Sequence, residues 1–299
     1  MSTPALTIDA AAAATPVMRQ RQWAMLLRAT LRQWRARIGL AIFVLMLLVA
    51  LAGPLIAPHS PTQFVAAPNS PAGQNGLLFG SDALGRDVWS RFLYGGRSVL
   101  GMSVAATVIG VGLGLVVGLS AAYLGGLVDE VLMRIADVFM AFPQIVLALL
   151  LLAAFGPSVP LIILIVGLSH APRVARVIRG AAQQVVERDF IKSAEAVGES
   201  RRRIIFGELL PNVTSPLLVE LGLRLTYSIG LIAAINFIGL GLQPPSADWG
   251  LMINENRLAV TVQPWGVLLP VLAIALLTIG TNLLTDGYAR AAIGIDRGE

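Results

Sequence analysis

Charged side chains gather in one stretch of this sequence, residues 179–216, where basic and acidic residues alternate. A run of apolar residues passes through it at three- to four-residue spacing: Phe190, Ile191, Ala194 and Val197. That spacing predicts a short helix with one apolar face and one charged face. The chemistry that such a helix offers is binding rather than catalysis.

Gly198 follows this predicted helix and would end it, because glycine tolerates the left-handed conformation found just past a helix end. A second helical stretch, 201–210, is expected to stop at Pro211. An exposed amphipathic helix suits a groove on a soluble partner. A solvated loop and a surface patch for anionic lipid are the alternatives.

The chain carries no phosphate-binding loop of the Gly-x4-Gly-Lys-Ser/Thr type. Its single lysine, Lys192, precedes Ser193, but Val186 and Ile191 occupy the two glycine positions. Backbone amides and the lysine hold the phosphates in such a loop. Any ATP-driven activity therefore requires a partner.

The composition provides few residues that could bind a metal ion or act as a nucleophile. Cysteine is absent, which excludes disulfides, thiolate nucleophiles and zinc–sulfur sites. His59 and His170 are the two histidines. We expect no catalytic residue, no metal site and no enzyme activity on this chain, and the placement of the basic residues favours a role in membrane topology over binding to nucleic acid.

Ionisable residues inside apolar stretches are few. Asp137 lies three residues after Arg134, Glu220 and Arg224 form an i,i+4 pair, and Asp286 stands alone. All are expected near one membrane face, where long side chains can reach water. Structural pairing is favoured over a proton relay.

Small polar residues on the last two apolar stretches form a second candidate site. They either line a translocation path or serve helix packing, and packing is the favoured alternative. The set is Thr226, Tyr227, Ser228, Asn236, Thr278, Thr281 and Asn282.

The elements that must position these residues are membrane helices. The chain has 299 residues, of which 56% are hydrophobic and 13% charged, with a mean hydropathy of +0.76. Soluble proteins carry about 25% charged residues, so much of this surface must face lipid. Apolar stretches of about 20 residues predict six membrane helices, at 38–57, 98–123, 131–155, 159–178, 217–240 and 265–289.

Basic residues set the orientation, because those near span ends stay in the cytoplasm. With a cytoplasmic amino terminus, most arginines fall on the inner side, and the outer side holds only Arg86, Arg91, Arg97 and Arg257. Both termini are therefore expected in the cytoplasm. A cleaved signal peptide at 38–57 is the disfavoured alternative, because its apolar run and basic lead are both too long.

The outer segment before the second span contains a candidate interfacial helix at 87–94. Its apolar side chains, Trp89, Phe92 and Leu93, would face lipid, and Arg91 would face water.

Three glycines recur every four residues in the second span. Gly110, Gly114 and Gly118 would share one face of that helix and admit a close neighbour.

Part of the charged stretch 179–216 resembles a loop of a known protein family. Residues 194–212 resemble the cytoplasmic loop of bacterial ABC-importer permeases, whose pattern is Glu-Ala-Ala-x3-Gly-x9-Ile-x-Leu-Pro. Ala194, Gly198, Leu210 and Pro211 fall in register. The motif's Glu, first Ala and Ile are replaced by Lys192, Ser193 and Glu208.

Further motifs in the same order resemble the dipeptide/oligopeptide/nickel permease family. They are LFGSD-x2-GRDVWSR with YGGR at 78–97, IGLGLQPP at 238–245, DWG at 248–250 and NLL-x-DG at 282–287. The amino-terminal anchor with Ala57 and Pro58 resembles the C-type subunit. The resemblance covers the chain from about residue 35 to its end.

The resemblance implies an all-α, multi-pass protein of the bacterial cytoplasmic membrane with the type I ABC-importer permease fold. It divides the chain into a basic cytoplasmic tail (1–37), an anchor (38–57), an extracytoplasmic segment (58–97), a five-helix permease core (98–289) with its coupling loop (179–216), and a cytoplasmic tail (290–299).

The implied function is import of dipeptides, oligopeptides or a related small solute, driven by ATP that partner subunits bind with Mg and hydrolyse. Expected partners are a homologous B-type permease, two ATPase subunits, an extracytoplasmic solute-binding protein and membrane lipid. The residues that would dock an ATPase are Lys192, Ala194, Glu195, Ala196, Gly198, Leu210 and Pro211. An autonomous secondary transporter or channel is the alternative function.

Overall fold

The computed structural model describes residues 25–296. The predicted tails fall partly outside this range, at 1–24 and 297–299. Residues 25–32 are helical, and a break at Gln33 separates them from the first long helix.

Five long helices carry the fold. They are α2 (Trp34–Ile56), α3 (Val88–Leu124), α6 (Val159–Val186), α10 (Thr214–Ile238) and α12 (Trp265–Asp296). All five are long and apolar enough to cross a membrane, as the sequence predicts. Polar side chains fix two of their starts: Asp87 accepts from the first amides of α3, and Ser158 caps α6.

The third predicted span is wrong as a single helix. Residues 126–155 form α4 (Gly126–Ala141) and α5 (Gln144–Phe155), which meet at a bend of 82°. Pro143 explains the break, because it has no amide hydrogen and holds the preceding residue extended; Phe142 has φ −91° and ψ 135°. Counted as one broken span, the pair brings the candidate crossings to six.

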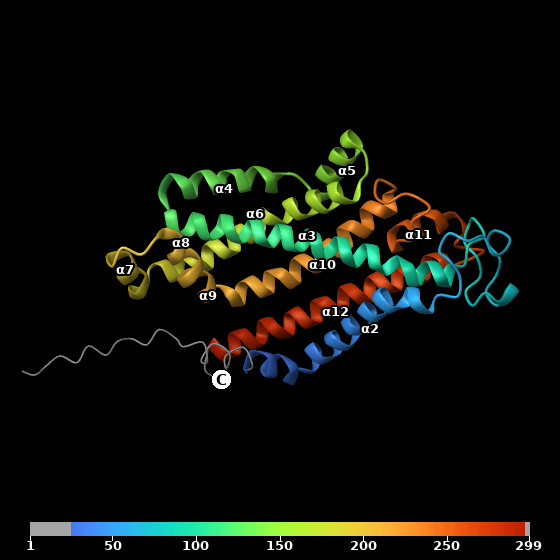
Figure 1. The fold of residues 1–299 in the computed structure, drawn as a ribbon, viewed down its shortest axis with the longest axis horizontal. Coiled ribbons are helices and arrows are strands. Elements are labelled where there is room, and N and C mark those ends of the chain that lie inside the picture. The colour runs from blue at the N-terminus through green and yellow to red at the C-terminus, as the bar shows by residue number, and fades with distance from the viewer. Residues whose placement is uncertain (1–24, 297–299) are drawn as a thin grey trace, which may run out of the picture.

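Shorter helices lie at the two ends of the bundle. α7 (Asp189–Ala196), α8 (Arg201–Arg203), a π-helical turn (Ile204–Leu209) and α9 (Leu210–Asn212) connect α6 to α10 at one end, which we call the α7 end. α11 (Trp249–Asn256) and the segment 57–87 lie at the opposite end, the α11 end (Figure 1). α2 begins and α12 finishes towards the α7 end, as an even number of crossings requires.

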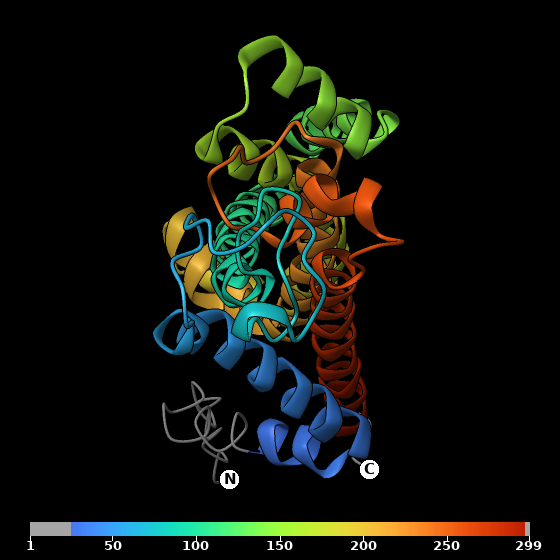
Figure 2. The ribbon, with the colours of Figure 1, turned by 90° about the vertical axis from the view of Figure 1, so that its right-hand side faces the viewer.

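The helices form three groups across the bundle. Figures 1 and 2 show α2 and α12 on one flank, α4 and α5 on the opposite flank, and α3, α6 and α10 between them. Most of α2 is therefore left facing outward, and only 22% of its most apolar window is buried in the chain.

The glycine face of α3 packs directly on α6, which confirms the predicted close neighbour and identifies it. A Cβ at Gly110 would lie 2.5 Å from the carbonyl oxygen of Gly167, and one at Gly114 would lie 2.7 Å from that of Ala171. Real side chains do not come so close, so only glycine lets these backbones touch. This contact forms the centre of the fold.

The predicted interfacial helix at 87–94 does not exist as a separate element, because these residues are the first turns of α3. Arg91 is completely buried rather than facing water, and Phe92 and Leu93 are buried in the chain rather than facing lipid. Trp89 is half-buried. The physical reason is a set of charged partners for Arg91, described below.

Candidate functional site

α7 is the predicted amphipathic helix, and its end is well defined. The amide of Gly198 donates to the carbonyl of Glu195, and the amide of Glu199 donates to the carbonyl of Ala194. The distance from nitrogen to oxygen is 3.0 Å in both hydrogen bonds. These two bonds satisfy the last carbonyls of the helix and require a left-handed residue at Gly198, whose φ is +83°. The pattern at the sequence level therefore predicts both the helix and its end.

The apolar side of α7 is anchored in the bundle. Ile191 is 1% exposed and belongs to a cluster with Ile178 and Val185 of α6, Leu119 of α3, and Ile204 and Leu209 of the following turn. Ala194 packs against the same cluster. The orientation of α7 is thus fixed by burial of one face.

The other side of α7 faces outward. Among the residues predicted to dock an ATPase, Lys192, Glu195, Ala196 and Gly198 are exposed, and Leu210 and Pro211 are half-buried further along the loop. Val197, at the tip, is 84% exposed.

The second helical stretch does not stop at Pro211, contrary to the sequence-based expectation. The chain widens into the π-helical turn Ile204–Leu209 and continues through α9 to Asn212. Pro211 lies in the first turn of α9, where its missing amide hydrogen costs little. The real break is at Val213, where φ is −105° and ψ is 13°.

A surface groove separates α7 from the π-helical turn. It encloses about 350 Å³, with Phe190 and Val197 on one side and Ile204 on the other. An ion pair between Arg203 and Glu199, 3.2 Å apart, closes one edge. The loop therefore offers an apolar groove with charged edges.

The residues of the predicted translocation path are not gathered on one surface of this chain. Ser228 and Asn236 are completely buried, Thr226 is buried, Thr278 is half-buried and Asn282 is exposed. The hydroxyls of Thr226, Thr278 and Thr281 each donate to the carbonyl four residues earlier in their own helix. Tyr227 is exposed beside them.

A histidine that sequence reasoning set aside lies at the middle of the bundle. His170 of α6 is completely buried, and its Nε2 lies 3.1 Å from the hydroxyl oxygen of Ser228 on α10. The same hydroxyl lies 3.1 Å from that of Thr107 on α3. Three helices thus share one polar contact. A lone histidine inside an apolar stretch is the signal that could have found it.

The interior charges are paired, partly as predicted. Glu220 and Arg224 are buried on α10 with Oε2 and Nε 3.0 Å apart, which confirms the i,i+4 pair. Asp137 pairs with Arg176 of α6 and not with Arg134, which is a correction. The reason is the packing of α4 on α6, which brings Arg176 to Asp137 and leaves Arg134 exposed. Asp286 is also exposed.

At the α11 end, four charged residues form a buried cluster that the sequence analysis missed. Arg86 Nε lies 2.6 Å from Asp82, and Arg86 Nη2 lies 3.0 Å from Glu255. Arg91 Nη2 lies 2.6 Å from the same Glu255 oxygen and donates to the carbonyl of Ser246. Two positive and two negative charges balance. The cluster fastens the segment 57–87 and the start of α3 to α11.

Asp248 forms a second junction at this end. Its carboxylate accepts hydrogen bonds from Ser98 of α3 (2.6 Å), from Asn236 of α10 (2.8 Å) and from two amides of α11, which it caps. Burial raises the pKa of this carboxyl above its usual value, and the hydrogen bonds oppose that shift. Asn236 is accordingly held in place by Asp248 within the bundle.

In the part of the chain that the structure describes, no cluster of histidine and acidic residues could hold a metal ion.

Comparison with protein families gives two matches. Residues 110–292 match the family described as "Binding-protein-dependent transport system inner membrane component". Residues 21–72 match "N-terminal TM domain of oligopeptide transport permease C".

Curated relatives match over most of their length. The glutathione transport system permease protein GsiD of Escherichia coli is 35% identical over 95% of both chains. The dipeptide transport system permease protein DppC of Alkalihalophilus pseudofirmus is 33% identical over 86% of this chain and 84% of its own.

A solved structure shares the fold. A chain of the MetNI methionine ABC transporter, described as showing inward facing conformations, superimposes with a TM-score of 0.52 over 66% of this chain and 96% of its own. The identity between the two sequences is 17%.

Proposed function

The chain belongs to the inner membrane components of binding-protein-dependent transport systems, and on this premise we propose that it is the C-type permease subunit of an importer for dipeptides, oligopeptides or a related small solute. The relatives named above carry dipeptide and glutathione. Both solutes are short peptides with charged ends. The same class of solute is proposed here.

The observation that carries the proposal is the geometry of α7. One face of this helix is anchored by Ile191 and the other is presented outward at one end of the bundle. This is the arrangement that a soluble partner can push upon. The proposed docking surface comprises Lys192, Ala194, Glu195, Ala196, Gly198, Leu210 and Pro211, with Val197 at its tip.

The proposed assembly supplies what this chain lacks. Two ATPase subunits would bind ATP and Mg, one of them against α7, and a homologous B-type permease would complete the passage. A solute-binding protein would deliver the solute at the α11 end. This assignment makes the α7 end and both termini cytoplasmic, in agreement with the distribution of basic residues.

The proposed passage uses polar side chains of α10 and α12. Asn282 is exposed on a membrane-spanning helix, and an exposed amide in hydrocarbon is costly. A polar passage beside α12 would give this amide hydrogen-bonding partners. Thr278, one turn away, is half-buried on the same helix. Thr226, Ser228 and Asn236 of α10 are buried between the helices of this chain, so within the proposed passage they support the helices rather than face the solute.

The experiment compares two exposed valines at opposite ends of the molecule. Val197→Glu places a charge on the proposed docking surface, whereas Val262→Glu places the same charge at the α11 end; both side chains are well exposed. We expect Val197→Glu to lose the ATPase subunits during co-purification and Val262→Glu to retain them. Both proteins should insert into the membrane. Equal retention of the ATPases by the two variants would refute the docking assignment.

A second measurement separates this proposal from an autonomous transporter. Liposomes containing this chain alone should show no solute flux down a gradient. Flux without partner subunits would replace the proposal by a channel or secondary transporter.

A further inference from the structure

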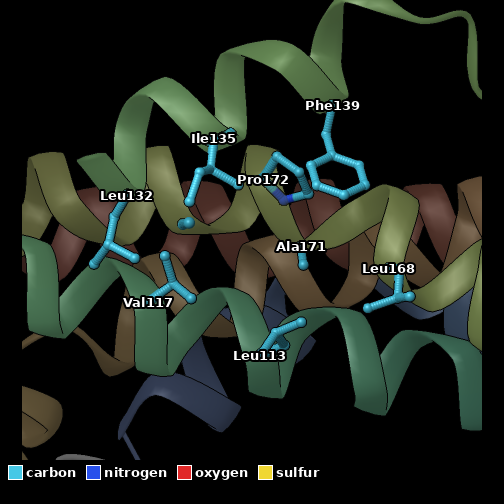
Figure 3. A pocket seen from close by; sticks show the side chains of 10 residues that line it. Leu113, Val117, Leu132, Ile135, Phe139, Leu168, Ala171 and Pro172 are labelled. Atoms are coloured by element: carbon cyan, nitrogen blue, oxygen red, sulfur yellow. The ribbon is translucent and has the colours of Figure 1, made fainter. Parts of the chain in front are cut away.

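An apolar pocket, partly open to the surface, lies under α4. It has a volume of about 220 Å³, and every residue that lines it is apolar. Figure 3 shows side chains of α4 pointing down into it and side chains of α3 and α6 forming its floor. The residues used below are Leu113, Leu132, Ile135, Phe139, Leu168 and Ala171. A cavity with no polar lining gives water no hydrogen-bonding partner.

A charged cavity lies between the same two helices, α4 and α6, nearer the α7 end. It encloses about 540 Å³ and is lined by Asp129, Glu130 and Asp137 of α4 and by Arg176 and Arg179 of α6. Arg179 lies 2.5 Å from Asp129, and Arg176 pairs with Asp137. Three carboxylates and two guanidinium groups leave one excess negative charge. The cavity thus offers both charges, with a small negative excess.

The distance between the two cavities matches half a bilayer. Asp129 and Phe139 are ten residues apart on one helix, which is about 15 Å at about 1.5 Å per residue. The hydrocarbon core of a membrane is about 30 Å thick. Half of that thickness, the depth of one leaflet, therefore equals the distance along α4 from Asp129 in the charged cavity to Phe139 at the far end of the apolar one.

We propose that the groove between α4 and α6 binds one phospholipid whose headgroup carries a phosphate and a primary ammonium. The phosphate lies against Arg176 and Arg179, because guanidinium groups bind phosphate oxygens in pairs. The ammonium lies against Glu130, the carboxylate that neither arginine neutralises. An acyl chain enters the apolar cavity.

The charge of the groove selects this headgroup over others. A purely anionic headgroup would meet the excess carboxylate, and a trimethylammonium group has no N–H to donate to it. The proposal concerns the groove between α4 and α6 and is independent of the solute that the importer carries.

The test uses the complete importer in nanodiscs that contain an aminophospholipid with a photoactivatable diazirine on its acyl chain. After irradiation, peptide mapping by mass spectrometry should place adducts on the cavity residues of α4 and α6. Adducts on a helix of the second permease that occupies the groove would overturn the proposal, as would labelling spread evenly over α2 and α4.

Two leucines one turn apart on α6 provide a matched pair. Leu168→Trp fills the apolar cavity, whereas Leu164→Trp adds the same ring outside it; both leucines are partly exposed. Leu168→Trp should lower the labelling of α4 several-fold and Leu164→Trp should leave it unchanged. Equal labelling of the two variants would overturn the acyl-chain site.

Competition on the unmodified complex tests the headgroup and does not depend on any variant folding. Unlabelled aminophospholipid should displace the probe, and lipids with choline or glycerol headgroups should displace it poorly. Glu130→Gln should weaken that preference, whereas Glu187→Gln, an exposed residue outside the cavity, should not. Equal displacement by all three lipids would refute the assignment of the ammonium.

Discussion

Arg91 and Glu255 lie 2.6 Å apart, guanidinium nitrogen to carboxylate oxygen, although 164 residues separate them in the chain. Neither side chain is free to find another charge, because Arg91 is fully buried and Glu255 nearly so. Arg86 shares the same carboxylate oxygen. This contact explains why an arginine can lie inside the fold, and it gives the first of four predictions.

Glu255→Gln should destabilise the protein. The amide keeps the shape of the side chain but leaves Arg86 and Arg91 with one carboxylate between them. Removing one member of a buried charge pair costs about 3 kcal/mol or more. Reversible unfolding in mixed micelles measures the change, with Glu187→Gln on the surface as the control, expected within about 0.5 kcal/mol of the parent. A Glu255→Gln variant as stable as the parent would contradict the cluster.

Gly114→Ala should destabilise the contact between α3 and α6, and Gly112→Ala should not. A Cβ at Gly114 would lie 2.6 Å from Val174 Cβ, whereas one at Gly112 meets nothing within 4 Å. Forcing a methyl group into a filled space costs about 1–3 kcal/mol. Alanine at the open position should instead stabilise the helix by up to about 1 kcal/mol. The same unfolding measurement ranks the pair, and equal shifts would disprove the close packing.

Gly198→Val should uncouple peptide uptake from ATP hydrolysis in the reconstituted importer. The left-handed φ at Gly198 costs a β-branched residue more than about 1 kcal/mol, so the end of α7 should rearrange. No neighbour within this chain lies within 4 Å of an added Cβ, so backbone strain is the expected effect on the chain itself. Gly180→Val, in the open interior of α6, is the control. Uptake and hydrolysis that stay in parent proportion in Gly198→Val would show that the end of α7 does not transmit motion.

Asp248→Asn should flatten part of the dependence of stability on pH. Burial raises the pKa of Asp248 in the folded protein, so the folded state holds this proton more tightly than the unfolded chain does. Stability should therefore fall as the pH rises from the unfolded pKa of about 3.9 through the higher folded pKa. The difference in unfolding free energy between parent and variant, followed across that range, isolates this residue. A constant difference would contradict the raised pKa.

The sequence predicts those parts of the fold that depend on local pattern. The five long helices follow from apolar runs, α7 from the spacing of Phe190 to Val197, and the α3 contact from glycines every fourth residue. Pro143 is also a local signal for the break between α4 and α5. The single-helix prediction overlooks it because the apolar run continues through Pro143 without a charged residue.

The features that the sequence does not predict depend on partners that are distant in the chain. The pattern at 87–94 predicts an interfacial helix with Arg91 facing water, whereas Glu255, the partner that allows its burial, is supplied by a different helix. Asp137 was paired with Arg134 because helical spacing is local, whereas Arg176 comes from the neighbouring helix. His170 meets Ser228 across the bundle. Such contacts follow from packing and not from periodicity.

α3 is an uninterrupted helix of 37 residues, about 55 Å long at about 1.5 Å per residue. Leu119, near its last turn, shares an apolar cluster with Ile191 of α7, and Arg91, in its first turn, is clamped to α11. It therefore connects the α7 end to the α11 end as one continuous helix that is held by contacts at both ends. A tilt of one degree about one end of α3 would move the other end by about 1 Å, which predicts that a displacement of α7 is passed along α3 to the α11 end.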